Sequence, residues 1–158
     1  MNIELKNNDN INFSYSESAK CWMGTGLINS IKVDFEIYRE RYIQPNIDWA
    51  YFQDFVFNLE KNDSLPDLIK KSQTVLLSLA DAFGASIEDD ENIEDFKMDF
   101  AGLSFQGKSE SHFTKGYAYS LWFNIVSKKN INAYVDPYGV YIVDVETRFI
   151  VGAKREQC

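Results

Sequence analysis

The chain has 158 residues, of which 45% are hydrophobic and 15% aromatic, a composition typical of a packed globular protein. It carries 24 acidic against 16 basic side chains, so its net charge is -8 and its pI is about 4.6. Nucleic acids and anionic membrane surfaces bind to clusters of basic residues, so neither is expected as a partner of this chain.

Nothing in the sequence indicates export or a cofactor. Residues Met1 to Asn12 are polar, and no run approaches the ~20 apolar residues of a membrane span, so we expect a cytoplasmic protein. Cys21 and Cys158 are the only cysteines, and Cys158 is the last residue, which argues against a disulfide framework. With one histidine, they fall short of a zinc ligand set. We predict no metal and no cofactor.

The first third of the chain alternates apolar and polar residues, as strands do when one face lies in a core. This alternation covers Ile11 to Ser16, Cys21 to Ile28 and Ile31 to Tyr38. Asn29 and Ser30 form a short polar break between the last two runs, which predicts a hairpin turn there.

The middle of the chain has helical periodicity, with helices predicted over 47–59 and 65–83. Ser64 suits the N-cap of the second helix, Pro66 suits its first turn, and Gly84 suits its end. The apolar stripes, which we expect to be largely buried, contain Trp49, Phe52, Leu68, Val75, Leu76 and Leu79.

Alternation returns over 96–100, 117–126, 140–145 and 148–153. Strands therefore precede and follow the two helices, without regular alternation of strand and helix. This order predicts a single α+β domain over residues 1–158. In it, an antiparallel helix pair is inserted between N-terminal and C-terminal strands and packs on one face of an antiparallel sheet.

No pattern selects a catalytic centre. His112 is the only histidine and lies in a polar segment without a nucleophile motif, so we interpret it as a loop residue. Gly24-Thr25-Gly26 resembles the start of a phosphate loop, but neither a GxGxxG pattern nor a lysine or helix follows. Glycines inside a strand pattern favour a bulge or close backbone packing.

The densest charge feature is the stretch 86–99, which holds seven acids and one lysine. Carboxylates lose too much hydration when buried, so this stretch is either solvated or faces a positive partner. It lacks the Asp-x-Asp-x-Asp-Gly spacing of a calcium loop. The candidate partner-binding residues, selected by charge density, are Glu88, Asp89, Asp90, Glu91, Glu94 and Asp95.

The layout from about Ala19 to Arg155 also suggests a family. A Trp-Met-Gly-Thr-Gly-Leu-Ile strand precedes a Val-Asp-Phe-Glu-Ile strand, an aromatic helix begins near Asp48, and a Tyr-Gly-Val-Tyr strand precedes a Phe-Ile-Val-Gly strand. This layout resembles the small acidic immunity proteins of bacterial polymorphic-toxin and contact-dependent growth inhibition loci. The resemblance implies a non-enzymatic binding protein that neutralises a cognate toxin domain, often a nuclease with a basic face.

Two other classes stay open. A small hydrolase could use a pair of carboxylates, although no sequence feature selects a pair among the 24 acids. An adaptor domain would need neither a catalytic pair nor a single partner. A deep pocket with convergent carboxylates or with His112 would favour the enzyme, and a neighbouring toxin gene would favour the immunity protein. The oligomeric state and the toxin's chemistry do not follow from the sequence.

Overall fold

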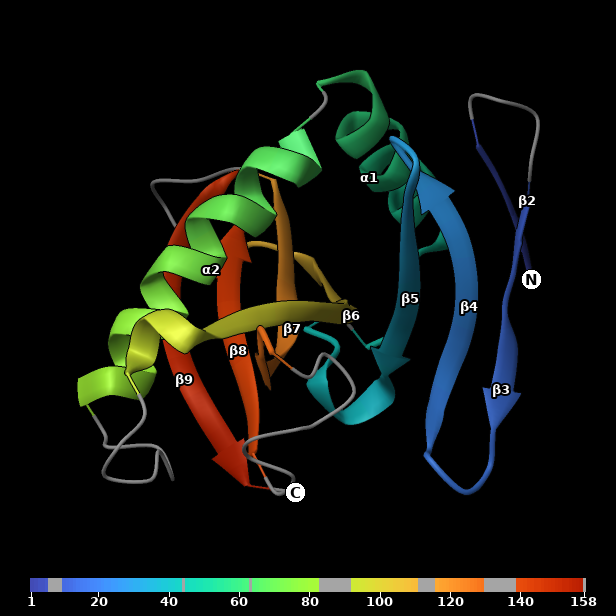
Figure 1. The fold of residues 1–158 in the computed structure, drawn as a ribbon. Coiled ribbons are helices and arrows are strands. Elements are labelled where there is room, and N and C mark those ends of the chain that lie inside the picture. The colour runs from blue at the N-terminus through green and yellow to red at the C-terminus, as the bar shows by residue number, and fades with distance from the viewer. Residues whose placement is uncertain are drawn as a thin grey trace.

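A computed structural model describes residues 1–5, 10–43, 45–62, 64–82, 92–110, 116–129 and 139–157 (Figure 1). The helices are α1 (Trp49–Lys61) and α2 (Ser64–Ala82), with short 3-10 turns η1 (Arg39–Arg41) and η2 (Ile93–Asp95). The strands are β1 (Asn2–Glu4), β2 (Asn10–Asn12), β3 (Ser14–Ser16), β4 (Cys21–Ile28), β5 (Ile31–Tyr38), β6 (Phe96–Lys108), β7 (Tyr117–Ser127), β8 (Gly139–Glu146) and β9 (Phe149–Gln157).

Strands β3 to β9 form one seven-stranded sheet in chain order, and β1 and β2 form a separate pair. All neighbours are antiparallel except β5 and β6, which are parallel and pair only at Phe35 with Leu103 and at Glu36 with Ser104. Both helices lie in the connection between these two strands, as a parallel crossover requires. The predicted α+β class, with helices between two groups of strands and packed on the sheet, is confirmed.

The N-terminal strand predicted over Ile11 to Ser16 is interrupted at Phe13, where β2 ends and β3 begins. Phe13 is 4% exposed, and its ring centroid lies 5.3 Å from those of Trp49 and Phe52. The chain therefore changes its pairing partner from β1 to β4 at the residue that enters the core.

The glycines of β4 serve close packing, as the sequence suggested. A Cβ on Gly26 would lie 2.6 Å from Ile11 Cγ1, and one on Gly24 would lie 2.8 Å from Ile11 Cγ2. The predicted turn at Asn29 and Ser30 is also confirmed, with φ angles of 51° and 65° that match a type I′ hairpin.

Strand β6 extends beyond the predicted 96–100. The prediction is too short because a bulge interrupts the alternation of apolar and polar residues in the middle of the strand. The register shifts between Phe100 and Gly102. Before the shift Phe96 and Met98 face the core, and after it Leu103 and Phe105 do. One extra residue changes which alternate positions point inward.

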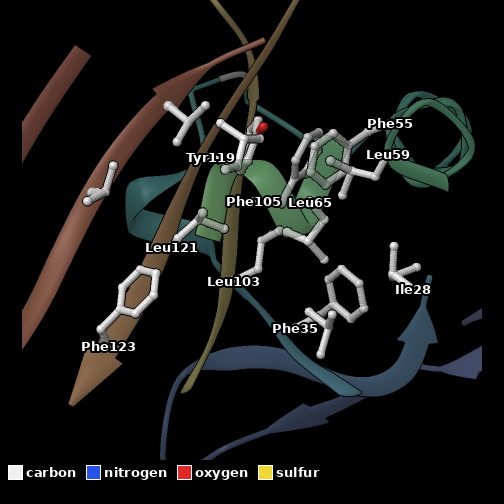
Figure 2. Packing of buried hydrophobic residues seen from close by; sticks show 14 of the residues in the cluster. Ile28, Phe35, Phe55, Leu59, Leu65, Leu103, Phe105, Tyr119, Leu121 and Phe123 are labelled. Atoms are coloured by element: carbon white, nitrogen blue, oxygen red, sulfur yellow. The ribbon is translucent and has the colours of Figure 1, made fainter. Parts of the chain in front are cut away.

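The core lies between the inner face of the sheet and the two helices (Figure 2). Phe55 of α1 packs with its ring centroid 4.8 Å from both Phe105 of β6 and Tyr119 of β7. From α2 the buried residues are Leu65, Leu68, Ser72, Leu76 and Ala80. In the part of the chain described, neither helix has the length and apolar character needed to cross a membrane.

The helix boundaries and one core position differ from the predictions. Helix α1 begins at Trp49, not residue 47, because the Asp48 carboxylate accepts a hydrogen bond from the Tyr51 amide at 3.0 Å. Ser64 is the first residue of α2, and Gly84 lies outside the described residues. The prediction that Val75 is buried is wrong.

Val75 is 39% exposed because the buried stripe of α2 is narrow, advancing in steps of three or four residues from Leu65 to Ala80. Val75 lies beside this stripe. Trp49 and Leu79 are partly buried and pack against the core, whereas Phe52, Leu68 and Leu76 are fully within it.

Leu76 and Val75 provide a matched pair for testing this packing. Leu76 is 0% exposed, so Leu76→Ala should lower the free energy of unfolding by about 2 to 5 kcal/mol. Val75→Ala should lower it by less than about 1 kcal/mol, because its side chain contributes less burial. Chemical denaturation followed by circular dichroism measures both. A loss below ~1 kcal/mol for Leu76→Ala would show that this stripe is not the core.

Candidate functional site

The face of the sheet opposite the helices, here called the outer face, carries a row of polar side chains across four strands. Glu36 of β5 pairs with Ser104 of β6, Ser104 with Ser120 of β7, and Ser120 with Asp144 of β8. Because each of these residues alternates with an inward-pointing core residue, all four side chains project from the same face. We call them the polar row.

Part of the polar row is joined by hydrogen bonds. Gln106 Nε2 donates to Ser120 Oγ at 2.7 Å, and Ser120 Oγ donates to Asp144 Oδ1 at 2.7 Å. Within the described chain, however, Glu36 Oε2 and Ser104 Oγ are buried without a hydrogen-bond partner. Unsatisfied buried groups are costly, which singles out this end of the row as a functional candidate.

A cleft of about 250 Å³, here called the outer-face cleft, opens on the same face. Its lining residues are Tyr38, Arg41, Trp122, Val140, Ile142, Glu156 and Gln157. They come from β5, η1, β7, β8 and β9. The cleft therefore forms only when the segment around residue 40 is folded against the three C-terminal strands.

Aromatic and charged groups meet in this cleft. The rings of Tyr38 and Trp122 stack with centroids 6.1 Å apart and an interplanar angle of 27°. The Arg41 guanidinium carbon lies 5.2 Å from the centroid of the Tyr38 ring, and Arg41 Nη2 lies 3.4 Å from Glu156 Oε2. The Trp122 indole nitrogen is buried and has no hydrogen-bond partner in the described residues.

Burial controls protonation beside the cleft. It raises the pKa of Glu36, an effect that a hydrogen bond from Tyr38 partly offsets. Burial also raises the pKa of the Tyr38 phenol and, with the nearby charge of Glu36, that of the Cys21 thiol. Cys21 is free and fully buried, so its thiol stays protonated and is not an activated nucleophile.

Glu156 has the opposite environment. A hydrogen bond from Lys154 at 3.1 Å lowers the pKa of its carboxyl, and Arg41 lowers it further. Lys154 also lies 3.7 Å from Asp144 Oδ2, which links the cleft to the polar row. At neutral pH the rim of the cleft thus combines an ionised carboxylate with two cations.

Of the six predicted acidic residues, the structure describes Glu94 and Asp95, and it does not place these two in the cleft. Glu94 and Asp95 lie in η2, where the backbone N–H of Lys128 donates to the Asp95 carbonyl at 2.8 Å. Lys128 is six residues beyond Trp122, about 20 Å along an extended strand.

The other predicted partner-binding residues, Glu88, Asp89, Asp90 and Glu91, lie outside the described residues, as do His112 and Cys158. Among the residues that are described, no group of three or more His, Cys, Asp or Glu side chains is placed to hold a metal ion.

No local sequence pattern identifies the outer-face cleft. The outward positions of the alternation over 117–126 include Trp122 and Ser120. An outward-facing Trp is a usable signal for a binding face, but pairing it with Tyr38 and Glu156 requires the register of the sheet.

No protein-family model, curated protein or solved structure matches the chain.

The environment of Glu36 predicts that the free energy of unfolding depends on pH. Its raised pKa means that the folded protein holds this proton to higher pH than the unfolded chain. The contribution of Glu36 to the free energy of unfolding therefore falls as pH rises from the ordinary value of 4.5 through the raised value, then levels off. Because Gln cannot ionise, Glu36→Gln should become progressively more stable relative to wild type across this window.

Urea denaturation between pH 4 and pH 7.5 measures this difference. Glu17→Gln, which removes an exposed carboxylate near β3, controls for the loss of one negative charge. If the stability of Glu36→Gln minus that of wild type stayed constant or fell as pH rises, the assignment would be contradicted.

Proposed function

We propose that the protein is an immunity-type binding protein that neutralises a cognate bacterial toxin domain by direct contact and catalyses no reaction of its own. The observation that carries the proposal is the outer-face cleft, which brings together Tyr38, Trp122 and Arg41. Aromatic residues such as Tyr and Trp are among the residue types that contribute most binding energy at protein interfaces. Charged groups at the rim, Glu156 and Lys154, match the polar border of such sites.

The placement of the cleft supports this proposal. The buried residues of α1 and α2 pack on the inner face (Figure 2), so the cleft lies on the side of the sheet that these helices do not cover. A sheet face with stacked aromatic rings, an apolar floor of Val140 and Ile142, and charged edges suits a protein surface better than a solvated layer.

Net charge indicates the kind of partner. A chain with a charge of -8 attracts a basic domain over a distance of about one Debye length, roughly 8 Å at physiological salt. Glu88, Asp89, Asp90, Glu91, Glu94 and Asp95 supply much of that charge. We propose that these acids speed the encounter in the cytoplasm, while the outer-face cleft holds the bound partner.

The hydrolase alternative has less support. Glycoside hydrolysis needs two carboxyl groups about 5 to 10 Å apart in one site. Glu156 in the lining of the outer-face cleft and Asp144 beside it both contact Lys154, so this pair of carboxylates is already engaged. Arg41 also pairs with Glu156, and Ser120 donates a hydrogen bond to Asp144. Cys21 is held in its unreactive protonated form. A binding function requires neither an unpaired carboxylate nor a reactive thiol.

The proposal requires a neighbouring gene for a larger protein with a toxic C-terminal domain, and that domain, once identified, provides the test. Expressed alone in a bacterial host, that domain should arrest growth, and co-expression of this chain should restore growth and yield a complex on gel filtration. If growth is not restored and no complex forms, the immunity function is wrong.

Trp122→Ala should weaken this complex by about tenfold or more, since truncating a central aromatic residue removes a main binding contact. Tyr15→Ala is the matched control, because Tyr15 is an aromatic residue, 40% exposed, whose side chain lies on the opposite side of the sheet from the cleft. Thermal melting verifies that both variants are folded. Equal affinity for wild type and Trp122→Ala would show that the partner binds elsewhere.

The acidic segment predicts a kinetic effect. Reversing Asp89, Asp90, Glu91 and Glu94 to Lys should slow association with the toxin domain and flatten its salt dependence, since charges at an interface rim act mainly on the on-rate. Stopped-flow association across ionic strength measures both. An unchanged rate and salt slope would assign these acids to a solvated surface without a role in binding.

A further inference from the structure

The protein already places one of its own guanidinium groups on the outer-face cleft. Arg41 lies over the Tyr38 ring and within 3.4 Å of Glu156, so it makes a cation–π contact and an ion pair at once. These are the two interactions that bind a basic side chain most favourably.

The hold on Arg41 is weak. Its side chain is 48% exposed and its Glu156 partner is 37% exposed, and exposed ion pairs contribute little to stability. Arg41 also ends η1, a three-residue turn with no buried residue. The guanidinium can therefore leave the cleft without disturbing the core.

The rest of the cleft also suits a long basic side chain. Val140 and Ile142 form an apolar floor on which the methylene groups of Arg or Lys can pack. Glu156 remains ionised at neutral pH, because Lys154 and Arg41 lower its pKa, and can pair with the charged end. Tyr38 and Trp122 offer aromatic surface beside it.

We infer that the outer-face cleft is a receptor for an arginine or lysine side chain of the partner, and that Arg41 is an internal competitor that the partner's side chain displaces from Glu156. This inference rests on the proposed function for the identity of the partner. The occupant of the cleft can nevertheless be tested without any toxin.

An acidic group would use the same residues differently. A carboxylate from a partner would bind to Arg41 and Lys154, so removing Arg41 would weaken its binding. A basic group would bind more tightly after removal of Arg41, because the Tyr38 ring and the Oε2 atom of Glu156 would lose their internal partner, while Glu156 Oε1 stays paired with Lys154. The sign of the effect of Arg41→Gln therefore distinguishes the two occupants.

The test uses N-acetyl-argininamide as the probe, followed by NMR of the three tryptophan indole N–H resonances of the ¹⁵N-labelled chain. Trp122→Phe assigns the Trp122 resonance. Addition of the probe should shift that resonance with a dissociation constant of about millimolar, as expected for a ligand of this size. The neutral N-acetyl-glutaminamide and the acidic N-acetyl-glutamate amide should bind more weakly.

Arg41→Gln should tighten N-acetyl-argininamide binding by about two- to fivefold, the range of an exposed ion pair, and Glu156→Gln should weaken it by a similar factor. Lys20→Gln removes the same charge from an exposed pair with Glu17 on the loop between β3 and β4, and should have no effect. This control separates the local competition from the change in net charge.

Three results would overturn the inference: no shift of the Trp122 resonance in either wild type or Arg41→Gln, weaker binding after Arg41→Gln, or preference for the acidic probe. Each would leave the growth-rescue result standing, because that experiment does not depend on what occupies the cleft. Conversely, a failed rescue with probe binding intact would reject the toxin partner and keep the receptor for a basic side chain.

Discussion

The parallel contact between β5 and β6 is the constraint on which the rest of the structure depends. It consists of two residue pairs, Phe35 with Leu103 and Glu36 with Ser104, and it joins the N-terminal strands to the C-terminal strands. The first pair points into the core and the second points to the outer face. One register therefore sets both the packing against the helices and the course of the polar row.

Core packing stabilises the contact between β5 and β6, which has the buried polar groups of Glu36 and Ser104 on its outer side. Phe105 stacks on Phe55 of α1, and Leu103 and Phe35 are each 1% exposed. On the reverse side, Glu36 has a raised pKa and the Ser104 hydroxyl lacks a hydrogen-bond partner within the described chain. Departures from full satisfaction of buried polar groups are expected at functional sites, where the surrounding fold compensates for them. Here the compensation comes from the aromatic core directly beneath.

The described part of the acidic stretch lies apart from the cleft. Glu94 and Asp95 lie in the 3-10 turn η2, where the Asp95 carbonyl accepts a hydrogen bond from Lys128. The cleft residues Tyr38, Trp122 and Glu156 are spread over most of the sequence, and none belongs to a local motif. In the proposed function the two features act at different stages, with long-range charge acting before contact and the cleft acting after it.

The sequence by itself determined the elements whose signals are local. The β4–β5 hairpin follows from alternation around Asn29 and Ser30, the two helices follow from their apolar stripes, and the class follows from their order. Tertiary structure alone decided the parallel β5–β6 contact and the extension of β6 beyond its bulge at Ala101. It also decided the meeting of Tyr38 with Trp122 and Glu156. Periodicity depends on neighbours a few residues apart, whereas strand register is set by packing between distant segments, which no local pattern encodes.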